Sequence, residues 1–552
     1  MASEHPRFRA KYATIDRCWR RLASSDRAGL YAALIVALAL QAAATAVSPV
    51  IAPDGIKFIE YAKALAADPL AAIRSHDQHP GFPALMLAVR PLTGWLFTGE
   101  SAWIAAARLV SGLAGIAAVV LVWAICRQLL DRRSAGVAAL LFALLPVPRQ
   151  NAADALSDST HLLLFLVSVW LACRALHHGS TLRLLAAGAM AGVAFWVRPE
   201  GVIVATAVVA CALLDPRWRS IFGWKRTLTG CAAVAIGAAA VVGPYVALSG
   251  KLTSKVTSKP GWQYLRAAAR PDPQPADALR RIGMGEDQHD RPWQGPLVKG
   301  MLAALEKFIN RLAESYVGVL LIPLVIGIVR TTRQVERPVA TMMWLLSSGY
   351  LALLILLYQL GGYIDRRHLI PLMALLAPSL ASGSMYLAEL ARQWSRRYRT
   401  VGVVSGALAV SLLVVLIVRS ARPLHESYLH RLEVAGWLRD TAQPGDSVAS
   451  NAIHVVYYSG IPGQYLTAES LVGQPPLDSP QFASQNRFLV VELDEDRHMP
   501  AWLADVGSDY QLVARVAGKS GTYQRDLVLY RARRSNRTAS TAGRAPSLQP
   551  SR

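Results

Sequence analysis

Long apolar runs alternate with short polar connections over the first 420 residues of the chain. A bilayer core about 30 Å thick takes ~20 apolar residues per helix, and fewer where neighbouring helices shelter the span. Eleven runs are candidates: 29–52, 101–126, 134–148, 158–173, 184–197, 200–214, 227–248, 314–329, 338–358, 369–389 and 401–419. The runs 134–148 and 200–214 are short. The pattern predicts an α-helical polytopic membrane protein with about eleven transmembrane helices.

Basic residues gather in the connections on one side of these predicted spans. Lys and Arg are concentrated in residues 7–27, 127–133, 174–183, 217–226, 330–337 and 392–399. Because basic short loops face the cytoplasm, segment 1–28 is expected to be cytoplasmic and 29–419 to form the transmembrane domain. The first span is expected to be a retained anchor, since no cleavable signal peptide is evident before it.

An odd number of spans then puts residues 53–100, the loop 249–313 and everything after 420 on the outer side. Within 53–100, the apolar stretch Phe82–Phe97 is interrupted by Pro83, Arg90 and Pro91. We expect it to lie at the interface as a helix, because counting it as a span would place the basic loops outside.

Residues 420–535 differ from the rest of the chain. A helical segment, Glu426–Thr441, precedes a Pro-Gly-Asp turn and four strand-like runs, Ser447–Asn451, Arg487–Glu492, Tyr510–Val516 and Leu527–Ala532. Helices interleaved with short β-rich runs predict a small extracytoplasmic α/β domain. The Ser/Thr/Pro/Arg-rich tail 536–552 is expected to be disordered.

The composition supports a membrane protein. Hydrophobic residues make up 53% of the chain and charged residues only 17%, whereas a soluble chain has about a quarter of its residues charged. The excess of 58 Lys+Arg over 36 Asp+Glu would indicate a nucleic-acid partner in a soluble protein. Here the partner implied is the lipid bilayer, and no nucleic acid is expected. The five cysteines form neither a disulfide framework nor a close zinc-binding pair, and are read as packing residues.

Asp54 follows the first apolar run by two or three residues, where hydrocarbon meets water. A carboxylate there can act as a general base, with its pKa raised by partial desolvation, or as a cation ligand. Pro53-Asp54 is also a reasonable N-cap for the next helix. Spacing alone leaves function and capping open.

A series of short motifs resembles the GT-C class of membrane glycosyltransferases, closest to the protein O-mannosyltransferase, aminoarabinose transferase and Rgt-like group. The motifs follow the family's order over roughly 50–375: Asp54 with Tyr61 and Leu65, His79-Pro80, Arg108-Leu109-Val110-Ser111, Asp154 to Asp158, Arg198-Pro199-Glu200-Gly201 and Arg366-Arg367-His368 before Pro371. Many members have His-Pro-Pro where this chain has His79-Pro80-Gly81. The resemblance therefore implies the class and not the substrate.

The resemblance implies an inverting enzyme that moves a sugar from a polyprenyl-phosphate carrier to a lipid, glycan or protein acceptor. Its site would lie at the extracytoplasmic face of the cell (inner) membrane, with the C-terminal domain periplasmic. The implied catalytic residues are Asp54, Asp158 (preferred to Asp154) and His79. The implied substrate- and phosphate-binding residues are Arg366, Arg367, Arg198, Tyr61 and Lys259, since departure of a phosphate needs fixed positive charge. Arg366 and Arg367 also suit interfacial anchors, and Arg198 suits a salt bridge to Glu200.

No cofactor follows with certainty from the sequence. His76, Asp77 and His79 could bind a divalent metal ion, but the sequence shows no further ligand to complete such a site. The outer loop 249–313 is expected to cover the cavity and help choose the acceptor. Two other functions stay open: a transporter or flippase, although no half-repeat is visible, and a polymerase or ligase of lipid-linked glycans.

Overall fold

The computed structural model describes residues 27–253, 297–334, 337–466, 480–493, 510–518 and 526–533. The chain divides into two compact units. Of the described residues, the first unit contains 27–47, 58–253 and 297–422, and the second contains 48–57 and those from 423 onward. Lys259, the tail 536–552 and most of the loop 249–313 lie outside the described residues.

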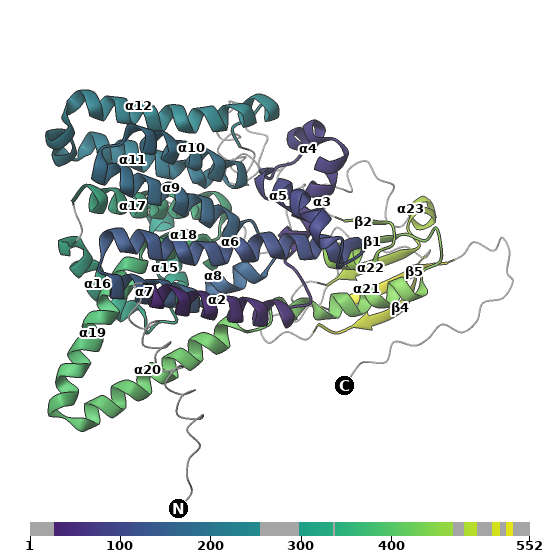
Figure 1. Cartoon of the computed structure of the whole chain (residues 1–552). Helices are drawn as coiled ribbons and strands as arrows, with labels where there is room; N and C mark the ends of the chain where they lie inside the picture. The colour runs from purple at the N-terminus through teal and green to yellow at the C-terminus, as the bar shows by residue number, and fades with distance from the viewer. Residues whose placement is uncertain are drawn as a thin grey trace, which may run out of the picture. The chain divides into compact units, whose positions relative to one another are not determined.

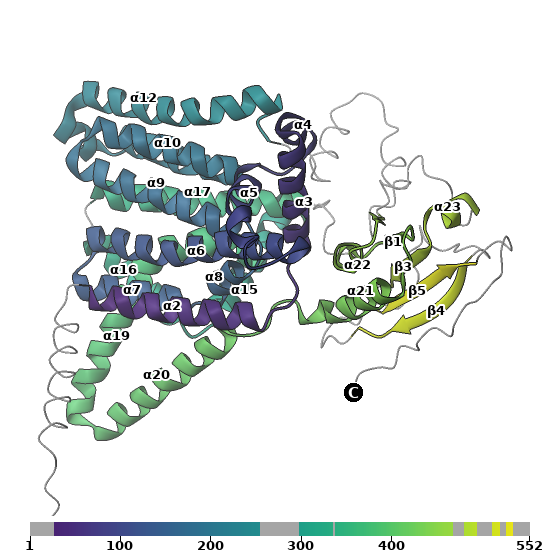
Figure 2. The same cartoon turned by 45° about the vertical axis from the view of Figure 1, so that its right-hand side comes forward.

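The first unit is helical. Most of its long helices run side by side as a bundle, whereas α19 and α20 run obliquely to it, and the short helices α4 and α5 lie at one end of it (Figures 1 and 2). The helices are α2 (Ala28–Ala46), α3 (Pro53–Ala67, whose first turn belongs to the second unit), α4 (Pro69–Ser75), α5 (Gly81–Thr93), α6 (Gly99–Leu129), α7 (Arg132–Leu144), α8 (Pro146–Ala153), α9 (Asp158–His178), α10 (Thr181–Val197), η1 (Pro199–Val202), α11 (Ile203–Leu214), α12 (Pro216–Ser249), α15 (Leu297–Ser315), α16 (Leu321–Gln334), α17 (Arg337–Gly361), η3 (Arg366–Leu369), α18 (Ile370–Leu375), α19 (Ala377–Arg397) and α20 (Arg399–Ser420).

The bundle is that of an integral membrane protein. Among the described residues, six helices are long and apolar enough to cross a bilayer, or seven if the pair Arg366–Leu375 and Ala377–Arg397, bent by 67°, is one span. Helices occupy every apolar run that the sequence predicted to span. Those at four of the eleven runs (α7, α10, α11 and α16) have only 13, 17, 12 and 14 residues, so the count of eleven stays a prediction.

Glycines let short helices pack tightly against long ones. A Cβ on Gly188 of α10 would lie 2.1 Å from the Val234 oxygen of α12, and one on Gly237 of α12 would lie 2.2 Å from the Leu185 oxygen of α10. Such close backbone approach is the usual use of small residues between membrane helices. The Gly-rich steps in this part of the sequence therefore serve packing.

Several predicted spans are divided or end elsewhere, and α2 ends at Ala46, before the predicted end of the first run at residue 52. The run 134–148 is divided, because Pro146 ends one helix and begins α8. The run 314–329 belongs to two helices, because Val317 and Gly318 have φ angles of 57° and 69°. A β-branched residue rarely adopts this left-handed conformation, so hydrophobicity gave no sign of the break.

The second unit contains a five-stranded mixed sheet with the order β2-β1-β3-β5-β4. β1 (Val448–Ser450) is parallel to β2 (Gly463–Tyr465) and β3 (Phe488–Glu492), whereas β5 (Leu527–Ala532) is antiparallel to β3 and β4 (Tyr510–Val516). Its helices are η4 (Glu426–Tyr428), α21 (Leu429–Thr441), α22 (Ile453–Ser459) and α23 (Pro480–Gln485). This confirms the predicted C-terminal α/β domain, to which the structure adds β2, α22 and α23.

Candidate functional site

Asp158 begins α9 at one end of the bundle, with its side chain only 7% exposed. Helices α9 and α10 are consecutive and antiparallel, so the start of α9 lies beside the end of α10 (Figure 1). There Arg198 donates from Nη1 to Asp158 Oδ1, and its Nη2 lies 3.4 Å from Glu200 Oε1. Pro199 disfavours a helical conformation at Arg198, which is extended at φ −152° and ψ 139°. The Arg-Pro-Glu turn thus places one guanidinium between two carboxylates.

The two carboxylates of this cluster keep the Arg198 guanidinium protonated. Burial alone would lower the pKa of the Arg198 guanidinium, but Asp158 and Glu200 outweigh burial and raise that pKa. Tyr350 of α17 and His368 of η3 lie within electrostatic range of Arg198 and Asp158. The cluster therefore combines a permanent cation, which can pair with a phosphate, and carboxylates, which can accept a proton.

The chain leading to Asp158 is also buried. Ser111 of α6 donates to the Leu156 carbonyl at 2.6 Å, and Asp154 Oδ1 accepts from the Ala155 N–H at 2.8 Å. Asp154 is the residue that the sequence ranked second at this position. Asp158, and not Asp154, pairs with Arg198. The catalytic role expected of Asp158 stays a prediction.

His79 packs against two aromatic rings beside the end of α10. Its ring stacks on Tyr245 at 4.8 Å and meets the edge of Phe195 at 5.0 Å, and its Nε2 lies 3.2 Å from Thr253 Oγ1. Gly81 packs against the same turn, where an added Cβ would lie 2.7 Å from the Trp196 oxygen. The glycine that departs from the family's His-Pro-Pro pattern is thus required by this close contact.

Tyr61 is fully buried, and its ring stacks on His76 at 4.1 Å. Burial raises the pKa of the Tyr61 hydroxyl, so it stays protonated at neutral pH. His76 Nδ1 lies 3.0 Å from the Ala72 carbonyl, and Asp77 is exposed in the following bend. No group of three His, Cys, Asp or Glu within the described residues could hold a metal ion.

The two arginines of η3 have different surroundings. Arg366 Nε lies 3.9 Å from Glu314 of α15, and its side chain is 45% exposed. Arg367 Nε lies 3.7 Å from Asp365, which caps η3, and the Arg367 charge also reaches the buried His368. His368 interacts in turn with Arg198 and Asp158, so η3 belongs to the same end of the bundle.

Asp54 stands in the first turn of α3, within the second unit, and its Oδ1 lies 4.0 Å from Lys57 Nζ. The nearby residue Ile51 is held by two hydrogen bonds. Its N–H donates to the Tyr458 hydroxyl at 3.2 Å, and its carbonyl lies 3.0 Å from His454 Nε2. The segment that leads to Asp54 is therefore anchored to α22 of the C-terminal domain.

A buried ion pair supports this anchor. His454 Nδ1 lies 2.7 Å from Arg431 Nη1, and Arg431 donates from Nη2 to both oxygens of Glu492 at 2.6 and 2.8 Å. Tyr428 covers the guanidinium at 4.0 Å. Sequence reasoning missed this network because its members, from Ile51 to Glu492, are far apart in the chain.

Sequence reasoning also missed Arg149 of α8. It is fully buried and donates to the Gly115 carbonyl at 2.9 Å, whereas its Nε and Nη1 have no partner among the described residues. The available signal was one arginine directly after an apolar run, since an ionisable residue at membrane depth is costly.

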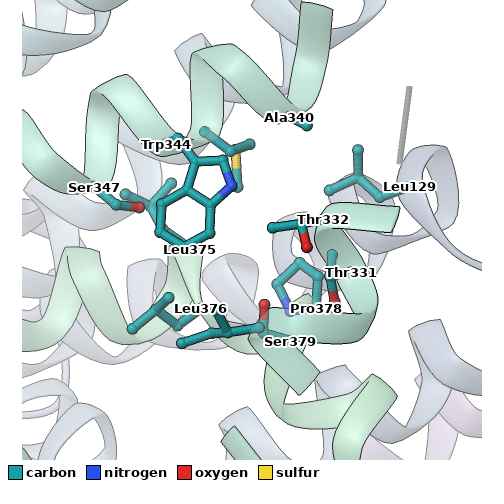
Figure 3. A pocket seen from close by; sticks show the side chains of 12 residues that line it. Leu129, Thr331, Thr332, Ala340, Trp344, Ser347, Leu375, Leu376, Pro378 and Ser379 are labelled. Atoms are coloured by element: carbon teal, nitrogen blue, oxygen red, sulfur yellow. The ribbon is translucent and has the colours of Figure 1, made fainter. Parts of the chain in front are cut away.

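A small cavity lies elsewhere in the bundle (Figure 3). Its volume is about 50 Å³, and its lining includes Leu129, Thr331, Trp344 and Ser379. Leu129 and Ser111 are 18 residues apart along α6, or about 27 Å at the helical rise of 1.5 Å per residue. The cavity is thus remote from the Asp158 end, and it is not the candidate site.

Part of the chain matches a known family. Residues 80–245 match the family model described as dolichyl-phosphate-mannose-protein mannosyltransferase. This range contains Asp158 and Arg198, and it begins at Pro80, directly after His79. No curated protein matches the chain.

Solved structures match over most of the chain. ArnT from Cupriavidus metallidurans, bound to undecaprenyl phosphate, is 14% identical with a TM-score of 0.58, and the match covers 92% of this chain and 98% of that one. The Archaeoglobus fulgidus oligosaccharyltransferase in the apo form is 12% identical with a TM-score of 0.53, over 92% of this chain and 75% of that one.

The archaeal oligosaccharyltransferase AglB from Archaeoglobus fulgidus, in complex with an inhibitory peptide and a dolichol-phosphate, is 13% identical with a TM-score of 0.50, over 84% and 69% of the two chains. At such identities the likeness establishes the fold. The chain has the GT-C fold, as its motifs implied.

Proposed function

We propose that the chain is an inverting glycosyltransferase that transfers a sugar from a polyprenyl-phosphate carrier to an acceptor at the extracytoplasmic membrane face. One observation carries the proposal: in a GT-C fold, the Asp158–Arg198–Glu200 cluster lies at the end of the bundle where the His79 segment packs on α10. The solved relatives in this fold were captured with undecaprenyl phosphate and with dolichol-phosphate. Both ligands are polyprenyl phosphates, the same class as the proposed carrier.

The chemistry needs a base and fixed positive charge. An oxygen of the acceptor attacks the anomeric carbon, the bond from that carbon to the phosphate oxygen breaks, and the configuration inverts. Asp54 takes the acceptor proton, and Asp158 orients the sugar or acceptor. Arg198, Arg366 and Arg367 stabilise the departing phosphate.

Further residues have supporting roles in the proposal. Lys57 stands one turn after Asp54 and adds positive charge beside it. His79 and Tyr61 shape the acceptor or phosphate pocket, and Lys259 contacts the phosphate. The acceptor is a lipid, a glycan or a protein.

The proposed topology follows the charges of the helix ends. Helix α9 has 21 residues and is therefore about 30 Å long, the thickness of a bilayer core. Asp158 is at its start and the basic connection 174–183 at its end, so the positive-inside rule puts Asp158 on the extracytoplasmic side. The N-terminal segment 1–28 is then cytoplasmic, and the domain 420–535 lies outside the cell (inner) membrane. A Cys at position 54 that a membrane-impermeant thiol reagent cannot reach in intact cells would contradict this topology.

The test is transfer of a radiolabelled sugar from its polyprenyl phosphate by the purified protein. Asp54→Asn keeps the shape of the side chain and removes the base, so label transfer should fall by about 10²–10⁴-fold, the usual contribution of a general base. Glu60→Gln is the matched control, because Glu60 lies on the same helix and pairs only at the surface with Lys63. Equal transfer by Asp54→Asn and wild type would remove Asp54 from the mechanism.

A further inference from the structure

An open groove of about 560 Å³ lies between the last turns of α6 and α9. These two helices run side by side in both views (Figures 1 and 2). The groove is lined by Trp123, Arg127 and Gln128 of α6 and by Trp170, Arg174 and His177 of α9. Since α9 is about 30 Å long, the groove lies at the end of the bundle opposite Asp158, and the glycosyl-transfer site does not use it.

The two helices present the same sequence pattern to the groove. Each carries Trp-x-x-Cys-Arg, as Trp123–Arg127 on α6 and as Trp170–Arg174 on α9. A spacing of four residues puts each Trp and its Arg on one face, one turn apart. The order from apolar helix to Trp to Arg matches the order from hydrocarbon to interface to phosphate in a bilayer leaflet.

An apolar track leads to each Trp. Two partly exposed apolar residues precede the Trp on each helix: Ile116 and Val120 on α6, and Leu163 and Val167 on α9. They are spaced three or four residues apart and therefore lie on the same helix face as the Trp. A soluble anion would make no contact with these apolar side chains, whereas the acyl chains of a lipid can lie along them. The tracks therefore favour an amphiphile as the occupant.

The groove offers hydrogen-bond donors and no negative charge. No Asp or Glu is among its lining residues. Neither Arg127 nor Arg174 forms an ion pair among the residues that the structure describes, and Arg174 is held over the Trp170 ring at 5.2 Å. Two guanidinium groups suit phosphate oxygens, because guanidinium pairs with phosphate in a bidentate way.

We infer that this groove binds the phosphate headgroup of an anionic membrane phospholipid, with its acyl chains along α6 and α9. Basic pockets between membrane helices are sites for such headgroups. The lipid would link the two helices at this end of the bundle. This binding is independent of the proposed glycosyl transfer.

The test measures lipid binding to the delipidated full-length protein in detergent by native mass spectrometry. The probes are phosphatidylglycerol, phosphatidylcholine and inorganic phosphate. Phosphatidylglycerol should bind, and the pair Arg127→Gln and Arg174→Gln should weaken that binding about tenfold or more, because each loses a charge-assisted hydrogen bond. The control pair Arg133→Gln and Arg183→Gln removes two charges from the first turns of α7 and α10, outside the lining of the groove. This pair should change phosphatidylglycerol binding less than about twofold, because salt screens charges that do not contact the lipid.

Three results would overturn the inference. Phosphatidylcholine binding as tightly as phosphatidylglycerol would show no headgroup site, and inorganic phosphate binding equally well would show a site for soluble anions. Equal weakening by both pairs of variants would show that the positive charge at this end of the bundle attracts the lipid nonspecifically, without a defined site. If the Gln pair does not fold, Arg127→Lys with Arg174→Lys keeps the charge and should still weaken binding, because Lys lacks the planar fork.

Discussion

The C-terminal domain is predicted to position Asp54 through the buried Arg431–Glu492 pair. Both side chains are only 8% exposed, so solvent screens their interaction little. Glu492→Gln leaves the Arg431 charge buried without its carboxylate, and removing one partner of a buried pair costs about 3–5 kcal/mol. That is about two to three and a half decades in the local opening equilibrium. Because Arg431 contacts His454 and His454 contacts Ile51, the segment leading to Asp54 should loosen with it.

The assay is amide hydrogen exchange on the full-length protein, read at Ile453–Ser459 and at residues 48–53, combined with label transfer. Glu492→Gln should speed exchange in both segments and lower kcat by roughly 10²-fold, because a displacement of about 1 Å is that costly to a reaction. Arg439→Gln is the control, since Arg439 is exposed on the same helix as Arg431 and such changes stay within about 0.5 kcal/mol. Fast exchange with unchanged transfer would refute the positioning role, and unchanged exchange would refute the energetics.

Three further predictions concern stability. Arg198→Gln leaves the buried Asp158 carboxylate and the half-buried Glu200 carboxylate without their cation and should cost about 3–5 kcal/mol. Adding Asp158→Asn should restore much of the Tm but no label transfer. Restored transfer would show that the pair is purely structural. Gly81→Ala puts a Cβ 2.7 Å from the Trp196 oxygen and should cost about 1–3 kcal/mol. Gly243→Ala of α12, with nothing within 4 Å, should keep or raise the Tm, because Ala favours the helix. A Gly81→Ala variant with a Tm no lower than that of the wild type would contradict the close contact. Burial, and then the charge of Arg431, lower the pKa of His430 in the folded protein. The unfolded chain therefore binds more protons than the folded chain as the pH falls, and stability should be lost below about pH 6.5. Between about pH 7.5 and 5.5 the Tm of His430→Gln should fall less than that of the wild type.

Local patterns in the sequence were sufficient to place most helices and strands. Apolar runs long enough for a membrane carry helices, and alternating runs after residue 447 carry strands. The three-residue strand β2 is too short to show alternation, and the break at Val317 depends on backbone angles that hydropathy does not encode.

The site was predictable in its parts but not in its pairings. Asp158 is at the start of its helix, as its sequence position indicated, and the Arg198–Glu200 contact was foreseen as one alternative. The contact between Asp158 and Arg198 joins residues 40 positions apart, and it arises only when α9 and α10 fold back on each other. The His454–Ile51 contact spans 403 positions and depends on the fold of the whole C-terminal domain.

The measurement that tests the central claim most directly is release of the free carrier. Purified protein is mixed with a polyprenyl-phosphate sugar and an acceptor extract, and the lipid products are separated by chromatography and weighed by mass spectrometry. A glycosyltransferase must produce one free polyprenyl phosphate for each sugar transferred, and Asp54→Asn should abolish both products together. A protein that returns only intact lipid-linked sugar, with wild type and Asp54→Asn alike, would be a flippase, and the proposed glycosyl transfer would be contradicted.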